Sequence, residues 1–416
     1  MPGALIFIGD ELISGLVKNL NLEVALKALD AEGIQVLEAL TLPDRIDLIC
    51  ERIKQLRTHS SFLIVSGGLG PTDDDLTTLA VAKALKLPLE ENKSIAQTLL
   101  SCKEYAATKE FAIKMALLPK GAVPIGKDYK TAGYMLDLKD CLVFCLPGVP
   151  YQFKEILFRV VIPTLKKRLA SEVKRTFRKE VLFFDVNETK LNRFLRETSV
   201  ERVKIGYYPE FPYLKLVLSG ERDEVGGLLD LIKKEFAEWF LGENPLEVLT
   251  GELLKEKKQT LGVAESCTGG FLSSLITSVP GSSEYFLEGI VSYSVESKKK
   301  ILGISEAVII ERGVVSYEVA MEMAEKVRSL AKSDYGIGIT GYAGPGGGEP
   351  ECPVGTVFIG IATSETLQAI RFRFPGNRRQ VQMIASCTAL DMLRRVLTYD
   401  KGVFRYRFAE GIKERH

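Results

Sequence analysis

Hydrophobic positions at the start of the chain fall into short apolar runs separated by helical patterns, which predicts alternating strands and helices. Residues 3–8 and 34–40 read as strands, and residues 21–31 and 45–57 read as helices. Two later apolar runs, FLIV and LVFCL, lead into the glycine turns SGGLGP and PGVP. Because continuously apolar strands separated by helices are typical of a parallel sheet covered on both faces, we predict a doubly wound α/β domain over residues 1–170.

Two changes of pattern divide the rest of the chain. A charged stretch, SEVKRTFRKE, precedes a segment that reads as strand, helix, strand, strand, helix, so we expect a small α+β module over residues 171–245. A third domain, again α/β, is expected over residues 246–416. The segments predicted before a glycine-rich loop are helix 246–257, strand 260–264, helix 270–277, strand 290–293, helices 295–302 and 316–331, and strand 336–339. After the loop we predict two further strands and helix 378–397.

Composition narrows the class of protein. A chain of 416 residues exceeds what one core supports, in agreement with several domains. Lys plus Arg number 55 against 54 for Asp plus Glu, which argues against a nucleic-acid coat or a membrane-surface binder. The first residues lack a basic leader and a cleavage site, no apolar run reaches spanning length, and the seven cysteines form no paired framework. We therefore expect a cytoplasmic protein with reduced thiols.

Histidine is scarce, and this restricts the chemistry. The chain has only His59 and His416, so Ser-His-Asp and Cys-His mechanisms and histidine-rich metal sites are nearly excluded. Any activated nucleophile must depend on lysine, tyrosine, a carboxylate or a metal.

The segment GVAESCTGG places two adjacent nucleophiles, Ser266 and Cys267, where a predicted strand ends and a helix begins. We expect the backbone N–H groups of Thr268, Gly269 and Gly270 to be unpaired there and to face a ligand, as in an oxyanion hole. The alternative is that Ser266 only caps the helix.

A possible base follows in YSVESKKKIL, where Lys298 lies in the first turns of a helix after a strand that ends at Tyr293. If the two strand–helix units are neighbours in a parallel sheet, both turns lie at the carboxyl edge where ligands bind. Lys298 then meets Ser266, and desolvation lowers its pKa so that it acts as a base. The alternative is a solvated run of three lysines.

Two further segments suit a ligand. A strand ends at Thr340 and opens the loop GYAGPGGG from Gly341 onward, which either wraps a ligand with backbone amides or is a flexible hairpin. Arg378 and Arg379 begin the last helix. The N-terminus of a helix is unfavourable for cations because of the helix dipole, unless an anion such as phosphate binds there. The alternative is that both arginines are simply solvated.

Together, AESCTGG, YS-x-x-x-K, GITGxAGPGGG, PVGTVFIGIA and G-x-R-x-x-V resemble the C-terminal domain of the CinA (competence/damage-inducible protein A) family. That domain is similar to nicotinamide mononucleotide (NMN) deamidases, which implies hydrolysis of the NMN carboxamide to nicotinic acid mononucleotide and ammonia without a cofactor. The resemblance makes Ser266 the nucleophile, Lys298 its base and Cys267 a bystander. Asn377 stands where the family usually has Asp. The substrate-binding residues that it implies are Tyr293, Thr268, Gly269, Gly270, Thr340, Gly341 and, for the phosphate, Arg378.

The first domain carries its own candidate site in SGGLGPTDDDLT. Asp73, Asp74 and Asp75 begin a helix, and three carboxylates exceed what capping needs, which suits Mg²⁺ carried with phosphates. The alternative is an overcapped, solvated turn. With GDELISG and LPGVP, this segment resembles the molybdopterin-binding-like domain of the same family, which is similar to metal-dependent ADP-ribose pyrophosphatases. The resemblance implies a divalent metal at Asp74 and Asp75 and a nucleotide site formed by Glu11, Asn21, Gly67, Gly68, Gly70, Thr72, Asp74 and Asp75.

The first domain departs from the family pattern at several positions. Asp10 precedes Glu11 where the family has G-T-E, Asn19 replaces Asp, and Gln152 replaces Glu. The segment VPIGKDYKTAGY, with its lysines at 127 and 130, replaces an Asn and a G-x-A-P-G turn. The fold is expected to survive, and we predict detectable hydrolysis of ADP-ribose with a divalent metal.

The middle module is similar to the KH-like domain of full-length family members. It has no GxxG loop and no basic–aromatic stripe, so we predict packing or dimerisation and no binding of RNA. The partners we expect are small nucleotides and a second copy of the chain, with no nucleic acid and no membrane. Two rival functions remain open, a protein that mainly cleaves ADP-ribose and a non-catalytic nucleotide-binding protein in DNA uptake or damage responses.

Overall fold

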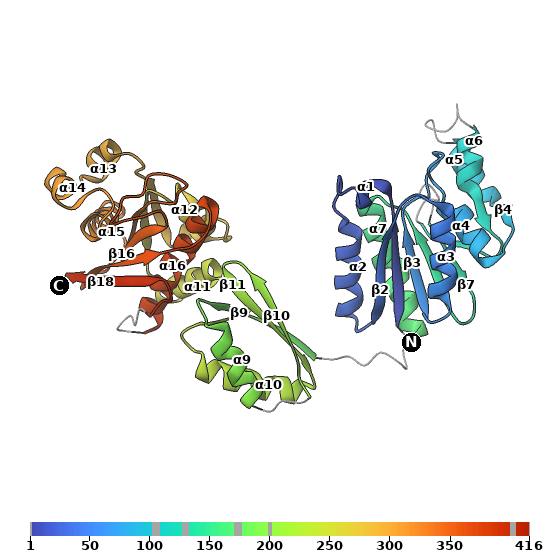
Figure 1. Cartoon of the computed structure of the whole chain (residues 1–416), viewed down its shortest axis with the longest axis horizontal. Helices are drawn as coiled ribbons and strands as arrows, with labels where there is room; N and C mark the ends of the chain where they lie inside the picture. The colour runs from blue at the N-terminus through green and yellow to red at the C-terminus, as the bar shows by residue number, and fades with distance from the viewer. Residues whose placement is uncertain are drawn as a thin grey trace. The chain divides into compact units, whose positions relative to one another are not determined.

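The computed structural model of the chain divides into two compact units, Met1–Arg175 and Thr176–His416 (Figure 1). The predicted boundary at 170/171 lies outside the described residues. The structure describes residues 2–101, 109–126, 133–169, 177–198, 202–399 and 405–415.

The first unit is built on a six-stranded sheet in the order β2-β1-β3-β8-β7-β6. Its first four strands are parallel, as predicted, whereas β7 and β6 pair antiparallel at one edge, which the sequence did not predict. A short antiparallel pair, β4 and β5, lies outside this sheet. The strands of the unit are β1 (Gly3–Ile8), β2 (Val36–Leu42), β3 (Phe62–Ser66), β4 (Leu89–Glu91), β5 (Leu117–Pro119), β6 (Val123–Pro124), β7 (Tyr134–Asp137) and β8 (Leu142–Leu146).

Helices cover both faces of this sheet, with α2 and α7 on one side and α3 and α4 on the other (Figure 1). Successive residues of β1 point to opposite faces, so Leu5 and Phe7 enter one core and Ile6 enters the other. The helices are α1 (Asp10–Ile13), α2 (Leu20–Ala31), α3 (Ile46–Arg57), α4 (Thr77–Leu85), α5 (Lys93–Ser101), α6 (Lys109–Ala116), α7 (Pro150–Ile156), the π-helical segment η1 (Leu157–Val161) and α8 (Ile162–Arg168).

The second unit begins with a four-stranded antiparallel sheet in the order β10-β11-β9-β12, against which two helices pack. The predicted sequence of strand, helix, strand, strand, helix is confirmed, and the short strand β12 is added at one edge. The elements are β9 (Phe177–Phe184), α9 (Glu188–Glu197), β10 (Lys204–Glu210), β11 (Tyr213–Gly220), α10 (Arg222–Glu235) and β12 (Phe240–Gly242).

A second sheet of six strands follows in the order β14-β13-β15-β16-β17-β18. The first three strands are parallel and the others are antiparallel. The prediction that a strand ends at Tyr293 is wrong, because β14 ends at Val291. The sequence also missed β18, whose residues are mostly exposed and have no apolar alternation. The strands are β13 (Leu261–Glu265), β14 (Phe286–Val291), β15 (Tyr335–Gly341), β16 (Thr356–Ala362), β17 (Leu367–Arg373) and β18 (Ala409–Arg415).

Helices again cover both faces of the sheet. The core on one face includes residues of α11, α12 and α16, and the cores on the other include residues of α13 and α15 (Figure 1). The helices are α11 (Leu246–Lys257), α12 (Phe271–Thr277), the 3₁₀ turn η2 (Ser282–Glu284), α13 (Val295–Leu302), α14 (Glu306–Arg312), α15 (Tyr317–Ala331) and α16 (Arg378–Thr398).

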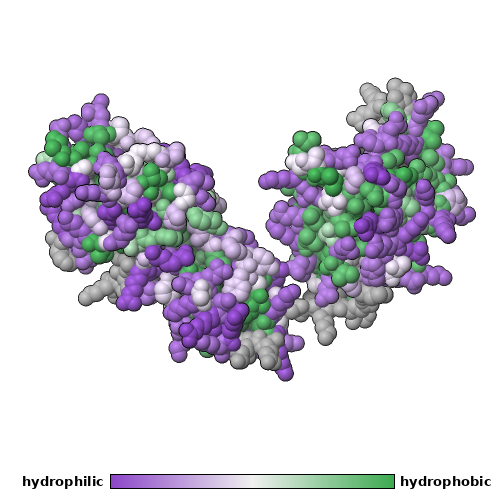
Figure 2. Space-filling model, viewed as in Figure 1, coloured by the Kyte–Doolittle hydropathy of each residue, from purple (hydrophilic) through white to green (hydrophobic). Residues whose placement is uncertain are grey.

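The visible surface is mostly hydrophilic, with hydrophobic patches between the hydrophilic residues (Figure 2). Among the described residues, none of the helices is both long enough and apolar enough to cross a membrane.

Candidate active site

The turn between β13 and α12 is organised by a buried carboxylate, that of Glu265. This carboxylate accepts hydrogen bonds from the backbone N–H groups of Gly270 (3.0 Å), Leu272 (3.1 Å) and Ser273 (2.8 Å), and from the Ser273 hydroxyl (2.6 Å). Glu265 therefore caps the helix, as negative charge at a helix N-terminus should. The alternative that Ser266 is the helix cap is wrong, because its side chain caps nothing and contacts Lys298 instead.

The backbone amides of this turn are less free than we predicted. The Gly269 N–H donates to the Ser266 carbonyl (3.1 Å), and the Gly270 N–H donates to Glu265. The prediction of three unpaired amides is therefore wrong for both glycines, whose positive φ angles of 63° and 93° close the turn. Thr268 remains as the candidate donor, and its buried hydroxyl has no hydrogen-bond partner among the described residues.

Lys298 and Ser266 lie together at the carboxyl edge of the sheet. Their strands β14 and β13 are parallel neighbours, with Ile290 opposite Ala264. The Lys298 Nζ atom is 2.8 Å from the Ser266 Oγ atom and donates to the Ser292 carbonyl at 2.7 Å.

The environment of Lys298 favours its neutral form. The side chain is completely buried, and this desolvation lowers the pKa of the amine to about 8. The alternative of a solvated lysine run is thus wrong for Lys298, whereas Lys300 is exposed and Lys299 pairs with Glu306 at 3.0 Å. A neutral amine in contact with a serine hydroxyl is able to take its proton.

Cys267, the other candidate nucleophile, is in an unfavourable environment. Burial raises the pKa of its thiol to about 12, so the reactive thiolate is scarce at neutral pH. Its carbonyl accepts a hydrogen bond from the Gln382 side chain on α16 (3.0 Å), which ties this turn to the last helix.

Arg378 connects two other predicted site segments. Its guanidinium donates to the Tyr293 hydroxyl (2.8 Å) and to the Gly344 carbonyl in the glycine-rich loop (2.7 Å). The structure therefore brings Tyr293 and Arg378 together as predicted. Arg379 instead lies over the Phe271 ring, 4.2 Å from its centroid.

The end of β15 is arranged differently from our expectation, because the strand continues through Thr340 to Gly341. The Thr340 hydroxyl is buried and donates to the Val314 carbonyl (3.0 Å), so its proton is used within the protein. Gly341 lies where a Cβ atom would be 2.6 Å from the Thr356 carbonyl oxygen, which makes glycine necessary. The loop after it joins two antiparallel neighbours, β15 and β16, and is therefore a hairpin.

Three residues at this site were missed by sequence reasoning. Glu265 and Gln382 hold the turn in place, and Ser292 is completely buried with a hydroxyl that has no partner among the described residues. Glu265 could have been found, because a glutamate that directly follows a continuously apolar strand is placed to be buried and then needs partners. Ser292 and Gln382 carry no such signal.

Six of the eight predicted nucleotide-site residues of the first unit line one cavity of about 520 Å³, whereas Asn21 and Thr72 do not. The prediction that Asp73, Asp74 and Asp75 begin a helix is wrong, because α4 begins at Thr77. Asn21 is buried and donates to the carbonyl of Gly148, a residue that lines the cavity, at 2.7 Å. Thr72 donates through its N–H (2.8 Å) and hydroxyl (2.5 Å) to the Asp75 carboxylate. Asp44 and Gln152 also line the cavity and were not predicted to bind a ligand. The predicted residues that line it are Glu11, Gly67, Gly68, Gly70, Asp74 and Asp75.

The charges around this cavity influence one another. Partial burial raises the pKa of Asp44, and the nearby charges of Asp10, Glu11 and Asp74 raise it further. The pKa of Asp74 is lowered, chiefly by the interaction of its own carboxylate with the Thr72 side chain. Within the described ranges, no three His, Cys, Asp or Glu side chains form a group that could hold a metal ion. The lysines at 127 and 130 lie outside the described residues.

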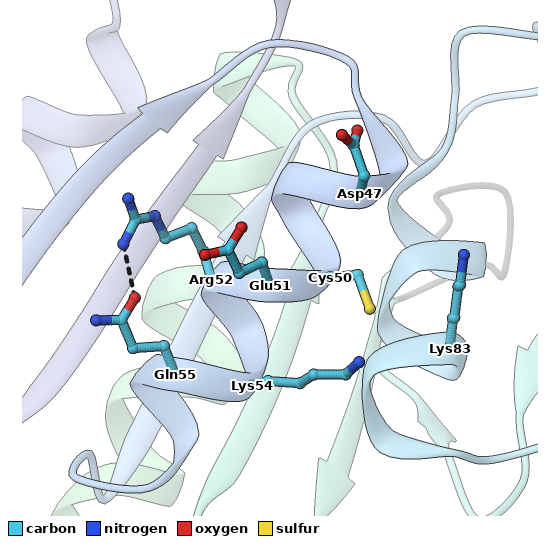
Figure 3. A pocket seen from close by; sticks show the side chains of 7 residues that line it. All are labelled: Asp47, Cys50, Glu51, Arg52, Lys54, Gln55 and Lys83. Carbon is cyan, nitrogen blue, oxygen red and sulfur yellow. Dashed lines mark hydrogen bonds between the residues drawn. The ribbon is translucent and has the colours of Figure 1, made fainter.

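A broader groove of about 750 Å³ runs along α3 and α4, away from every predicted site residue. Figure 3 shows Cys50 between Lys54 and Lys83, while Arg52 turns toward Gln55, to which it donates at 2.6 Å. Its lining mixes cations and carboxylates without a pairing that indicates a ligand, so we do not treat it as a functional site.

The fold and the site together define an α/β protein with a buried serine–lysine pair at a sheet edge. Residues 243–397 match the CinA C-terminal domain, and residues 4–167 match the family described as "Probable molybdopterin binding domain". A CinA-like protein from Desulfotalea psychrophila is 35% identical over 410 residues, covering 95% of this chain and 99% of its own. Another from Syntrophobacter fumaroxidans is 36% identical over 419 residues, covering 97% and 98%.

Part of the chain is also similar to a solved structure. A CinA superfamily protein from Klebsiella pneumoniae is 30% identical, with a TM-score of 0.36, over 37% of this chain and 96% of its own. Because the two CinA-like proteins are similar to this chain over nearly its full length, the chain belongs to the CinA family.

Proposed function

We propose that the second unit hydrolyses the carboxamide of nicotinamide mononucleotide to nicotinic acid mononucleotide and ammonia. The observation that carries this proposal is the 2.8 Å contact between the Lys298 amine and the Ser266 hydroxyl. The lowered pKa of Lys298 gives the amine a neutral fraction near neutral pH, and this fraction is the form that a base requires.

In the proposed reaction, Ser266 Oγ attacks the carboxamide carbon while neutral Lys298 takes the hydroxyl proton. The carbon–nitrogen bond of the tetrahedral intermediate then breaks, and Lys298 returns the proton to the nitrogen, which leaves as ammonia. Water, deprotonated by the same amine, attacks the acyl-serine ester. As this second intermediate collapses, the bond between the carbon and Ser266 Oγ breaks, and the Lys298 ammonium returns its proton to Oγ. The acid product loses its proton to solvent and leaves as the carboxylate.

The remaining site residues are assigned to substrate binding. Arg378 has a guanidinium suited to a phosphate, and its bonds to Tyr293 and Gly344 orient it beside the glycine-rich loop. The unpartnered Thr268 hydroxyl is the side-chain donor that we assign to the oxygen of the reacting carbonyl.

An assay of the full-length protein on NMN, with and without a chelator, tests the proposal. We expect equal amounts of ammonia and nicotinic acid mononucleotide, and the same rate in both conditions. Absence of turnover under both conditions would refute the proposal.

We propose hydrolysis of ADP-ribose in the first unit as a second candidate function. Its support is the cavity of about 520 Å³, which combines carboxylates with a glycine turn. The carboxylates have the chemistry that Mg²⁺ prefers, but the described residues do not group three of them around one point, so we derive no metal-assisted step. Release of AMP from ADP-ribose with Mg²⁺ tests this function, and nucleotide binding without turnover of either substrate would favour the non-catalytic alternative.

A further inference from the structure

A separate cavity of about 370 Å³ lies in the second unit, where residues that follow β9 and α10 meet the segment that leads into β18. The turn after β9 forms one wall with Val186, the segment between α10 and β12 contributes Phe236 and Trp239, and the segment before β18 contributes Tyr406. No predicted site residue of either unit lines it. Its volume falls in the range of small-molecule sites, which are mostly apolar with a few polar groups.

The apolar part of this cavity consists largely of aromatic rings. The Phe236 and Trp239 rings are 6.3 Å apart between centroids and inclined at 61°. Phe236 is fully buried and packs into the core of the four-stranded sheet, whereas Trp239 is only partly buried. A partly exposed indole in the wall of a cavity offers surface on which a second flat ring can pack.

The rim of the cavity is cationic. Lys190 Nζ lies 5.5 Å from the centroids of both the Phe236 and Trp239 rings, and Arg405 and Arg407 line the cavity as well. Asp185 is the one acidic group among the lining residues described, and its carboxylate accepts hydrogen bonds from the Arg407 N–H (2.9 Å) and Nε (3.0 Å).

The Asp185–Arg407 pair leaves Lys190 and Arg405 as the cations of the rim. The contact of Lys190 with Glu235 is long, at 3.8 Å, and both side chains are about half exposed, so it holds the amine weakly. Positive charge beside an apolar aromatic wall suits a ligand with one flat ring and one anionic group.

We propose that this cavity binds a planar aromatic anion of about mononucleotide size. Its ring packs against Trp239, and its anionic group pairs with Lys190 and Arg405. Both an aromatic carboxylate and a nucleotide phosphate have this chemistry. The proposal is independent of amide hydrolysis at Ser266.

Trp239 provides a local reporter, because it is the only tryptophan among the 416 residues. The full-length protein is titrated with AMP, with benzoate and with ribose 5-phosphate while tryptophan fluorescence is recorded. We expect saturable quenching at one site per chain by AMP, by benzoate or by both, and none by ribose 5-phosphate, which lacks a ring. Quenching by AMP alone identifies a phosphate-bearing ligand, and quenching by benzoate alone identifies an aromatic carboxylate.

Substitutions localise the binding. Lys190→Gln and Arg405→Gln should each weaken binding about tenfold, as expected for loss of one charged contact. Lys234→Gln is the matched control, since Lys234 is exposed on the neighbouring α10 and does not line the cavity. Trp239→Phe should remove the signal and provides the blank for light absorption by the probes.

Two results would overturn the proposal. One is the absence of saturable quenching by both AMP and benzoate. The other is quenching that Lys190→Gln and Arg405→Gln leave unchanged while both variants remain folded, because the probe would then be bound elsewhere.

Discussion

Lys298 has the property that a general base in this site requires. It is completely buried beside Ser266, and desolvation lowers its pKa to about 8. A lysine acts as a base only when neutral, so the rate should follow the deprotonated fraction of this amine.

The pH dependence of NMN hydrolysis should therefore rise through the pKa of Lys298. We expect kcat/KM to increase from about pH 6 and to level off above about pH 9, with a midpoint near 8. A profile that is flat or falls over this range would contradict a lysine base.

Substitutions of the two neighbouring candidate nucleophiles, Ser266 and Cys267, should have very different effects on the rate of NMN hydrolysis. Ser266→Ala should lower kcat by about 10³-fold or more, since it removes the attacking oxygen. Cys267→Ala should retain most of the activity, because the thiol is buried with a raised pKa and does not contact Lys298 by any described hydrogen bond. Steady-state ammonia release measures both variants, and the reverse order of effects would assign the nucleophile to Cys267.

Sequence reasoning places Ser266 and Lys298 together because parallel strands bring their following turns to one edge. It fails for the amides of Gly269 and Gly270, which are paired within the turn, and it does not predict the hydrogen bond from the Thr340 hydroxyl to the Val314 carbonyl. These contacts depend on how a buried carboxylate and a distant loop pack against the strand ends. Periodicity along the chain carries no such information.

At the scale of elements, the hydrogen bonds of the Glu265 side chain connect the end of β13 to the start of α12. Its carboxylate accepts four hydrogen bonds in a buried position, so it fixes the helix start that follows Ser266. An amide in its place has one oxygen acceptor and presents a donor to groups that also donate.

Glu265→Gln should therefore destabilise the second unit by about 3 kcal/mol. Urea unfolding followed by Trp239 fluorescence measures the change, since Trp239 lies in this unit. Glu288→Gln, at an exposed position of β14, is the control and should leave the midpoint unchanged. Equal midpoints for both variants would show that Glu265 does not hold the turn.

The predicted helices and strands agree closely with the structure where an element is buried on one face or completely. The predicted helix over 246–257 matches α11, and the buried strands β1, β3 and β13 match their apolar runs. The edge strands β6 and β18 were missed because short or exposed strands need little apolar alternation. Their pairing is determined by the neighbouring strand rather than by their own residues.

At the scale of the whole molecule, the two candidate sites lie in separate compact units, each with its own core. Sites that share no residues should respond independently to substitution. Asp75→Asn should reduce release of AMP from ADP-ribose and leave NMN hydrolysis unchanged, whereas Ser266→Ala should do the opposite. Parallel assays of both full-length variants test this, and loss of both activities in either folded variant would contradict independent sites.

The most direct test of the proposed serine–lysine mechanism compares ammonia release from NMN by the wild-type protein and by the variants Lys298→Met and Lys300→Met. Methionine removes the amine while filling similar space, and Lys300 is an exposed lysine on the same helix. We predict that Lys298→Met remains folded and loses at least about 10³-fold in kcat, while Lys300→Met keeps the wild-type rate. A folded Lys298→Met variant that releases ammonia at the wild-type rate would contradict the proposed serine–lysine mechanism.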